Sequence, residues 1–140
     1  MAKIIVVGVD GGEPSMRAAR RAAELAAQSG STLHVLTAVD QGRVEEYAGR
    51  PGTVQVTSGE VAEGVASDAA REMRTIVDRV TSSVAQGKPA TVLVDEAVRL
   101  EADLIVVGNR RVQGLTRVLG SVASAVAAHA PCDVYIVRTV

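Results

Sequence analysis

The segment between Gly108 and Ser121 carries the residues best suited to hold an anionic ligand. Gly108 ends a buried β-branched stretch, and Gly120-Ser121 begins a helix whose free N–H groups and dipole favour negative charge. The connecting loop is basic, and guanidinium groups pair well with phosphate oxygens. Its arginines are Arg110, Arg111 and Arg117. The same residues also suit tight turns, an ordinary helix start and a solvated surface, so the spacing leaves both interpretations open.

Two other strand ends bring polar or small residues to the same place. Asp10-Gly11-Gly12 follows the first buried stretch, and Ala38 lies near the end of the second. Ligands of open α/β sheets bind outside the carboxyl ends of the strands, so these residues are expected beside Gly108. The Asp10 carboxylate can accept hydrogen bonds from a ribose or an adenine, or it can cap the following helix. The hydroxyl of Ser15 has the same two roles open.

No established catalytic pattern occurs in the sequence. His34 lies within an apolar strand and His129 near a helix end, which favours packing or compensation of the helix dipole. Cys132 is the only cysteine, so no internal disulfide can form, and a buried inert thiol is the expected role. Neither the dinucleotide motif G-x-G-x-x-G nor the phosphate loop G-x-x-x-x-G-K-[ST] is present. We therefore expect no catalytic residue and no metal site.

Apolar runs and helical spacing predict the strands and helices that would position these residues. Strands are expected at 3–9, 32–39, 82–85, 103–108 and 133–137. Helices are expected at 13–29, 60–79, from Pro89 onward and at 120–130, with a surface loop at 40–58. Such alternation predicts an α/β fold: an open, mostly parallel five-stranded sheet with helices on both faces. Gly30 is expected to end the first helix.

Composition narrows the function classes. The 140 residues form one domain, 1–140, and a formal net charge of −1 argues against nucleic acid as a partner. Phe and Trp are absent, which leaves little aromatic surface for stacking bases. The apolar runs are far too short to span a membrane, and no signal-peptide pattern follows Met1. The sequence therefore predicts a cytoplasmic protein.

Three separated motifs closely resemble the universal stress protein family. They are VGVDGGEPSMRA at 7–18, ADLIVVGNRR at 102–111 and LGSVASAVAAHAPCDVYIV at 119–137, and the family's G-x-P-A appears as Gly87-Lys88-Pro89-Ala90. The resemblance covers the whole chain. It implies a Rossmann-like fold of the adenine nucleotide alpha hydrolase type.

The resemblance also implies an adenine nucleotide, ATP or AMP and in some members cyclic AMP, and leaves open whether Mg²⁺ accompanies it. Nucleotide-binding members carry G-x-x-G, nine residues and G-[ST]. Here Gly108 and Gly120-Ser121 match, whereas Arg111 replaces the second glycine and eight residues separate it from Gly120. Asp10, beside Gly11, matches the family's aspartate near the nucleotide, and Ala38 falls where a backbone group contacts adenine.

The leading hypothesis is a non-enzymatic, nucleotide-responsive stress protein. Any ATP hydrolysis would be slow, since no loop residue is an evident base for activating water. The final strand, Asp133 to Val137, invites pairing with its own copy, which predicts a homodimer. One alternative is a protein-interaction module that has lost the ligand, with Arg111 marking the loss. Another is a small-molecule enzyme on the same scaffold.

Overall fold

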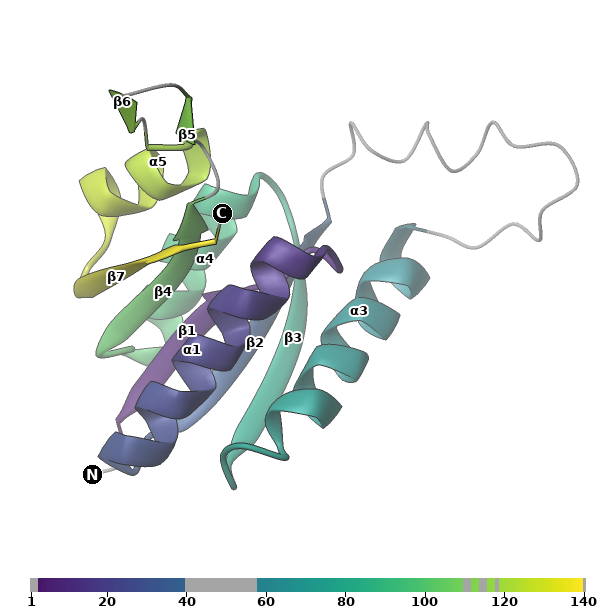
Figure 1. Ribbon diagram of the computed structural model, residues 1–140. Coiled ribbons are helices and arrows are strands. Elements are labelled where there is room, and N and C mark those ends of the chain that lie inside the picture. Colours follow the sequence, from purple (N-terminus) through teal and green to yellow (C-terminus); the bar gives the residue numbers. More distant parts are fainter. Residues whose placement is uncertain (1–2, 40–57, 110–111, 114–115, 118, 140) are drawn as a thin grey trace, which may run out of the picture.

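Strands and helices alternate along the chain (Figure 1). The computed structural model describes residues 3–39, 58–109, 112–113, 116–117 and 119–139. The strands are β1 (Ile4–Gly8), β2 (Thr32–Val39), β3 (Val80–Gln86), β4 (Leu104–Asn109), β5 (Val112–Gln113), β6 (Thr116–Arg117) and β7 (Asp133–Arg138). The helices are α1 (Glu13–Ser29), α3 (Ser58–Met73), α4 (Pro89–Leu100) and α5 (Ser121–His129). The loop predicted at 40–58 lies almost entirely outside the described residues.

Five parallel strands form one sheet in the order β3-β2-β1-β4-β7. The chain leaves β1 in one direction through β2 and β3, and returns to its other side through β4 and β7. Connections therefore diverge beside β1, and a crevice is expected at the carboxyl ends of β1 and β4. The predicted fold class is confirmed, and within this sheet every pairing is parallel.

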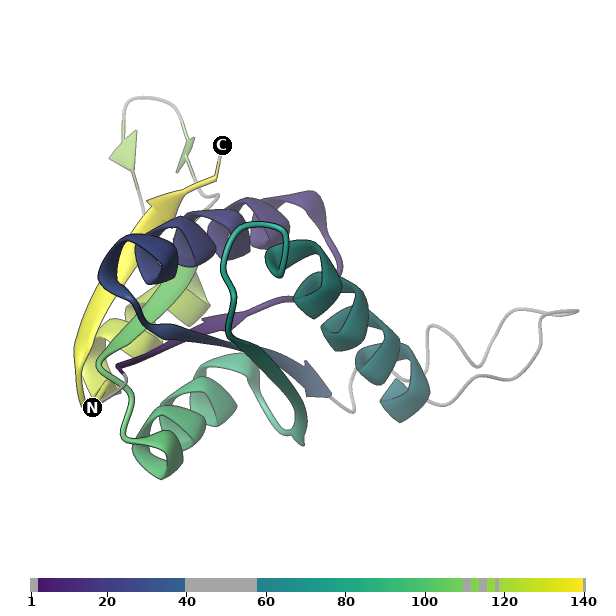
Figure 2. The same cartoon turned by 90° about the horizontal axis from the view of Figure 1, so that it is seen from below.

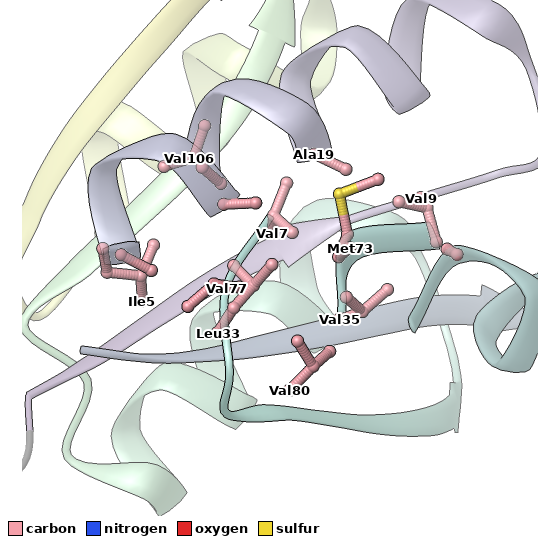
Figure 3. Close-up of a cluster of buried hydrophobic side chains, with 14 of the residues drawn as sticks. Ile5, Val7, Val9, Ala19, Leu33, Val35, Met73, Val77, Val80 and Val106 are labelled. Atoms are coloured by element: carbon pink, nitrogen blue, oxygen red, sulfur yellow. The ribbon is translucent and has the colours of Figure 1, made fainter. Parts of the chain in front are cut away.

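Helices cover both faces of the sheet, so side chains of one strand point alternately into two cores. Ile5 and Val7 of β1 pack with α1 and α3, whereas Val6 packs with α4 and α5. Figure 2 shows the sheet between these two helical layers. Figure 3 shows Ala19 of α1 and Met73 of α3 within the first of these cores. The buried face of α1 is entirely alanine: Ala18, Ala19, Ala22, Ala23 and Ala26. Such small side chains allow the helix to lie close to the sheet.

Several predicted boundaries are accurate. Gly30 ends α1 in the left-handed conformation, with φ of 69°, and Pro89 lies in the first turn of α4. The helix predicted at 60–79 is too long, because α3 ends at Met73 and the chain then turns. Ile76 continues the helical spacing but is 36% exposed, and Val80 begins a strand that is longer than predicted. The short antiparallel pair β5 and β6 was not expected.

The sequence predicted that no segment spans a membrane, and this prediction can be compared with the helices of the structure. Among the described residues, no helix combines the length and the hydropathy needed to cross a bilayer.

Candidate functional site

A pocket of about 310 Å³ lies where the carboxyl ends of the strands meet the starts of α1, α4 and α5. Sites for small organic ligands usually measure roughly 300–1,000 Å³, so the pocket is large enough to hold such a molecule. The strands and the residues that follow them contribute Gly8, Val9, Asp10, Leu36, Ala38, Val107, Gly108 and Thr139. The helices contribute Pro14, Ser15, Pro89, Val92, Leu93, Ser121 and Val122.

Asp10 organises the turn between β1 and α1. Its Oδ1 atom accepts hydrogen bonds from the Gly12 N–H and from the Ser15 hydroxyl, both at 2.8 Å. The Asp10 N–H in turn donates to Ser15 Oγ at 3.1 Å. Gly12, not Asp10, is the N-cap of α1. Asp10 and Ser15 thus hold a tight polar turn at the edge of the pocket. Of the two predicted roles of Asp10, that of helix cap is wrong, and contact with a ligand stays a prediction.

The start of α5 forms another part of the pocket wall. Gly120 is its N-cap, and the first intrahelical hydrogen bond runs from the Ser124 N–H to Gly120 O at 2.9 Å. The sequence predicted free N–H groups at this helix start, but the Gly120 N–H donates to Asn109 Oδ1 at 2.9 Å. The donors left without an intrahelical acceptor are those of the first turn, beginning with Ser121. They give this end of the pocket a partial positive charge.

Gly108 allows close packing at the end of β4, between α1 and the residue after β7. A Cβ atom at this position would lie 3.0 Å from Thr139 Cγ2 and 3.4 Å from Ala18 Cβ. Any side chain here would therefore press on Thr139, the residue after β7, and would touch Ala18 of α1. This close approach is a packing reason for the glycine, independent of its backbone angles.

The two ends of the pocket differ in chemistry. At the β2 and α4 end the walls are apolar, formed by Leu36, Ala38, Val92 and Leu93. At the β4 and β7 end lie Ser121, which begins α5, and Thr139. Asp10, which follows the central strand β1, lies between them in the sheet order. A ligand with an apolar flat part and an anionic part matches this gradient.

The structure brings most of the predicted site residues together. Asp10, Ala38, Gly108 and Ser121 line the pocket. Gly11 and Gly120 adjoin it without lining it; Gly11 instead has a φ of 89° and faces Val65 of α3. Arg111 lies outside the described residues.

Sequence reasoning missed several lining residues. The apolar walls from α4, Val92 and Leu93, carry no motif and could not have been distinguished from ordinary core positions. Thr139 was detectable, because it directly follows β7 and the rule of carboxyl ends applies to that strand as well.

A second polar cluster lies away from the pocket, between β2, β3 and α4. His34 Nδ1 is 2.7 Å from Thr81 Oγ1, and His34 Nε2 is 2.8 Å from Ser83 Oγ. Ser83 donates to Glu96 Oε2 at 2.6 Å, and Arg99 donates to the other carboxylate oxygen. A neutral imidazole with its proton on Nε2 satisfies all of these groups. We call these five residues the His34 network.

Burial shifts the pKa of His34, whereas hydrogen bonds shift the pKa of Glu96. Desolvation lowers the pKa of His34, opposed by the nearby Glu96 carboxylate. The hydrogen bond from Arg99 lowers the pKa of Glu96 to about 2, with a smaller contribution from Ser83. His34 is thus buried and neutral, in line with the predicted packing role, but it is also hydrogen-bonded on both ring nitrogens.

Two other predicted features bear on chemistry. Cys132 is half-buried, and desolvation raises the pKa of its thiol, so the neutral form dominates. No group of three His, Cys, Asp or Glu side chains that could hold a metal ion occurs among the residues whose placement is described.

A comparison with protein families gives one match that spans nearly the whole chain. The model of the universal stress protein family matches residues 1–138. A universal stress protein of Thermus aquaticus, encoded in the QAH/OAS sulfhydrylase 3' region, is 32% identical over 99% of this chain and 100% of its own length.

Solved structures share the fold. A universal stress protein crystallised in complex with cAMP has a TM-score of 0.76 and 29% identity, covering 99% of this chain and 98% of its own. The universal stress protein of Archaeoglobus fulgidus in complex with dAMP has a TM-score of 0.71 and 24% identity, covering 99% of this chain and 98% of its own. At that lower identity the likeness concerns the fold.

Proposed function

We propose that this chain, which belongs to the universal stress protein family, binds an adenine nucleotide in the pocket beside β1 and β4. The observation that carries the proposal is the pocket itself, in which apolar walls at one end face the start of α5 and the hydroxyl-bearing residues Ser121 and Thr139 at the other. The cAMP complex of a structural neighbour at 29% identity supports the choice of ligand class.

The pocket suggests how the nucleotide would lie. The base suits the apolar walls from β2 and α4, and Ala38 lies in that region. The phosphate suits the start of α5, where first-turn N–H groups and the dipole favour an anion. Asp10 lies between these two ends, where the ribose that joins base and phosphate would lie. AMP, ATP and cyclic AMP all share these three parts, and Mg²⁺ could accompany a polyphosphate.

The proposed role is binding without catalysis. Among the described pocket residues, Asp10 is the only carboxylate, and its Oδ1 is occupied by the turn to α1. The two histidines do not line the pocket. Binding would then report or buffer the nucleotide level, and any hydrolysis of ATP would be slow.

We further propose that the protein acts in the cytoplasm as a homodimer joined through β7. This strand is the last of the sheet, and Tyr135 on it is 37% exposed. An unpaired edge is a surface on which a second copy can add a strand. Sedimentation at tens of micromolar, the order of concentration used for such association, should show a dimer, and a monomer would contradict this part.

Mass spectrometry of the unmodified protein, purified without added nucleotide, tests the ligand. Native spectra should show the chain with an added adenine nucleotide, and denatured samples should release AMP, ATP or cyclic AMP. A chain that stays empty in repeated preparations, and that takes up none of the three when each is added in excess, would contradict nucleotide binding. The protein-interaction module would then become the better account.

A further inference from the structure

We propose that the Thr139 hydroxyl is a phosphate-binding group of the pocket, a role that rests on the proposed nucleotide function. The starting observation is an unmet hydrogen-bonding requirement. Thr139 is 5% exposed, and its Oγ1 has no hydrogen-bond partner among the described residues. A buried hydroxyl without a partner is costly, and native structures contain few of them.

The position of Thr139 places this hydroxyl at the phosphate end of the pocket. The residue directly follows β7, and its N–H donates to Asn109 O at 3.2 Å. The side chain of Asn109 accepts from the Gly120 N–H, the N-cap of α5. Asn109 is therefore hydrogen-bonded both to Thr139 and to the helix start that would hold an anion. Thr139 also lines the pocket, together with Gly108 and Ser121.

Contacts around Gly108 support the same conclusion. The Thr139 methyl group lies so near Gly108 that a Cβ there would come within 3.0 Å of it. The absence of a side chain at Gly108 keeps Thr139 in contact with the pocket. Rotation of χ1 by one staggered position brings the hydroxyl to the place now held by the methyl group, so an arriving oxygen can be met by the hydroxyl. A phosphate oxygen would accept this hydrogen bond and would satisfy the orphaned group.

The chain supplies a matched control in Thr37. Its Oγ1 is the other buried side-chain atom without a partner in the described part of the chain. Thr37 lies in β2 and is 4% exposed, but it does not line the pocket. If an unpaired hydroxyl were only an imperfection of folding, Thr37 and Thr139 would behave alike when the hydroxyl is removed. If Thr139 awaits a ligand, only its removal should affect binding.

The experiment compares Thr139→Val, Thr139→Ser and Thr37→Val with the unmodified chain, using AMP and adenosine as calorimetric probes. Valine keeps the shape of threonine and removes the hydroxyl, whereas serine keeps the hydroxyl. We expect Thr139→Val to weaken AMP binding roughly tenfold, the effect of losing one hydrogen bond to a charged group, and to leave adenosine binding unchanged. Thr139→Ser and Thr37→Val should bind AMP as the unmodified chain does. Urea unfolding should show that neither valine variant is destabilised without nucleotide, since each removes an unpaired polar group.

Equal AMP affinity in Thr139→Val and the unmodified chain would overturn the assignment. An equal loss for AMP and adenosine would also overturn it, because the hydroxyl would then not meet the phosphate. If the unmodified chain binds neither probe and also binds neither ATP nor cyclic AMP, the proposed function fails and this inference fails with it. If it binds only ATP or cyclic AMP, the same variants are compared with that nucleotide. If it binds AMP and only the valine result is negative, the function stands and Thr139 has no part in it.

Discussion

The His34 network and the pocket are both polar regions at the sheet, but they differ in how far the chain satisfies them. In the His34 network both ring nitrogens and both carboxylate oxygens of Glu96 have partners within hydrogen-bonding distance. In the pocket the Thr139 hydroxyl has none among the described residues, and the first-turn donors of α5 have no intrahelical acceptor. A polar group completed by the chain stabilises the fold, whereas one left incomplete beside a pocket is available to a ligand.

This contrast separates two effects that are often confused. Changes in the His34 network should alter the free energy of unfolding and leave binding alone. Changes at the pocket should alter binding and leave the fold largely intact. Each variant below is therefore measured both by urea unfolding and by nucleotide titration.

Gly120→Asp should give the largest change in binding. A Cβ at Gly120 would lie 3.4 Å from Asn109 Oδ1, an ordinary contact, so the fold should persist. The added carboxylate at the helix start would repel phosphate and would itself neutralise the positive end of the dipole that favours the phosphate. We expect nucleotide affinity to fall by at least about 100-fold, or ~2.7 kcal/mol, in a calorimetric titration.

Gly120→Asn is the matched control for that variant. Its side chain has the same shape without the charge, and asparagine is a favourable N-cap residue. It should keep much more affinity than the aspartate variant. If both variants bind as the unmodified chain does, the phosphate does not lie at the start of α5.

His34→Ala should have the opposite pattern. It removes the shared partner of the buried Glu96, the half-buried Ser83 and the exposed Thr81. We expect a loss of about 2–4 kcal/mol in the free energy of unfolding, from unpaired polar groups and the space left behind. Nucleotide affinity, measured below the onset of unfolding, should be unchanged. A comparable loss of affinity would mean that the two regions are coupled.

Arg111→Ala should have a moderate effect on binding. Arg111 replaces a family glycine but can contribute a charge-assisted hydrogen bond to phosphate, worth about 1.5–3 kcal/mol. We expect roughly tenfold weaker ATP binding, with a smaller difference at high salt. Tighter binding by Arg111→Ala or Arg111→Gly would show that Arg111 obstructs the pocket, which would favour the interaction module.

The smallest expected effect is the pH dependence of the free energy of unfolding, which arises from the His34 network. The pKa of His34 is lowered in the folded state, so below the unfolded value near 6.5 the unfolded chain binds more protons. Stability from His34 is therefore fully present above that value and is lost as the pH falls through it. Glu96 adds a further loss between pH 4.5 and about 2, its ordinary and folded pKa values.

His129 provides the control for this titration, because the chain has two histidines. Urea midpoints between pH 7.5 and 5.5, a span of roughly one unit on each side of the histidine pKa, should fall in the unmodified chain and in His129→Gln. The fall should be smaller in His34→Ala. The same slope in all three proteins would contradict the lowered pKa of His34.

The sequence predicted the parts of this molecule that depend on local pattern. The run from Ile4 to Val7 could only be a strand buried on both faces, and the order of strands and helices then determined the fold class. The end of α3 was missed because Ile76 and Val80 continue a helical period after the backbone has turned. Periodicity describes side-chain spacing, not where a helix stops.

Contacts between residues distant in sequence limited how much of the site could be predicted from the sequence. Asp10, Ala38, Gly108 and Ser121 could be placed at one edge because each is tied to a strand end or a helix start. The hydrogen bonds of His34 depend on the parallel register that sets it beside Thr81 and on α4 placing Glu96 nearby. No local pattern contains that information, and the same holds for the orphaned hydroxyl of Thr139.

The most direct test of the account is a calorimetric titration of the unmodified protein with AMP, ATP and cyclic AMP. The account predicts saturable binding of at least one of them, with one nucleotide per chain, and loss of that binding in Gly120→Asp. No saturable heat with any of the three, or equal binding by Gly120→Asp, would contradict it.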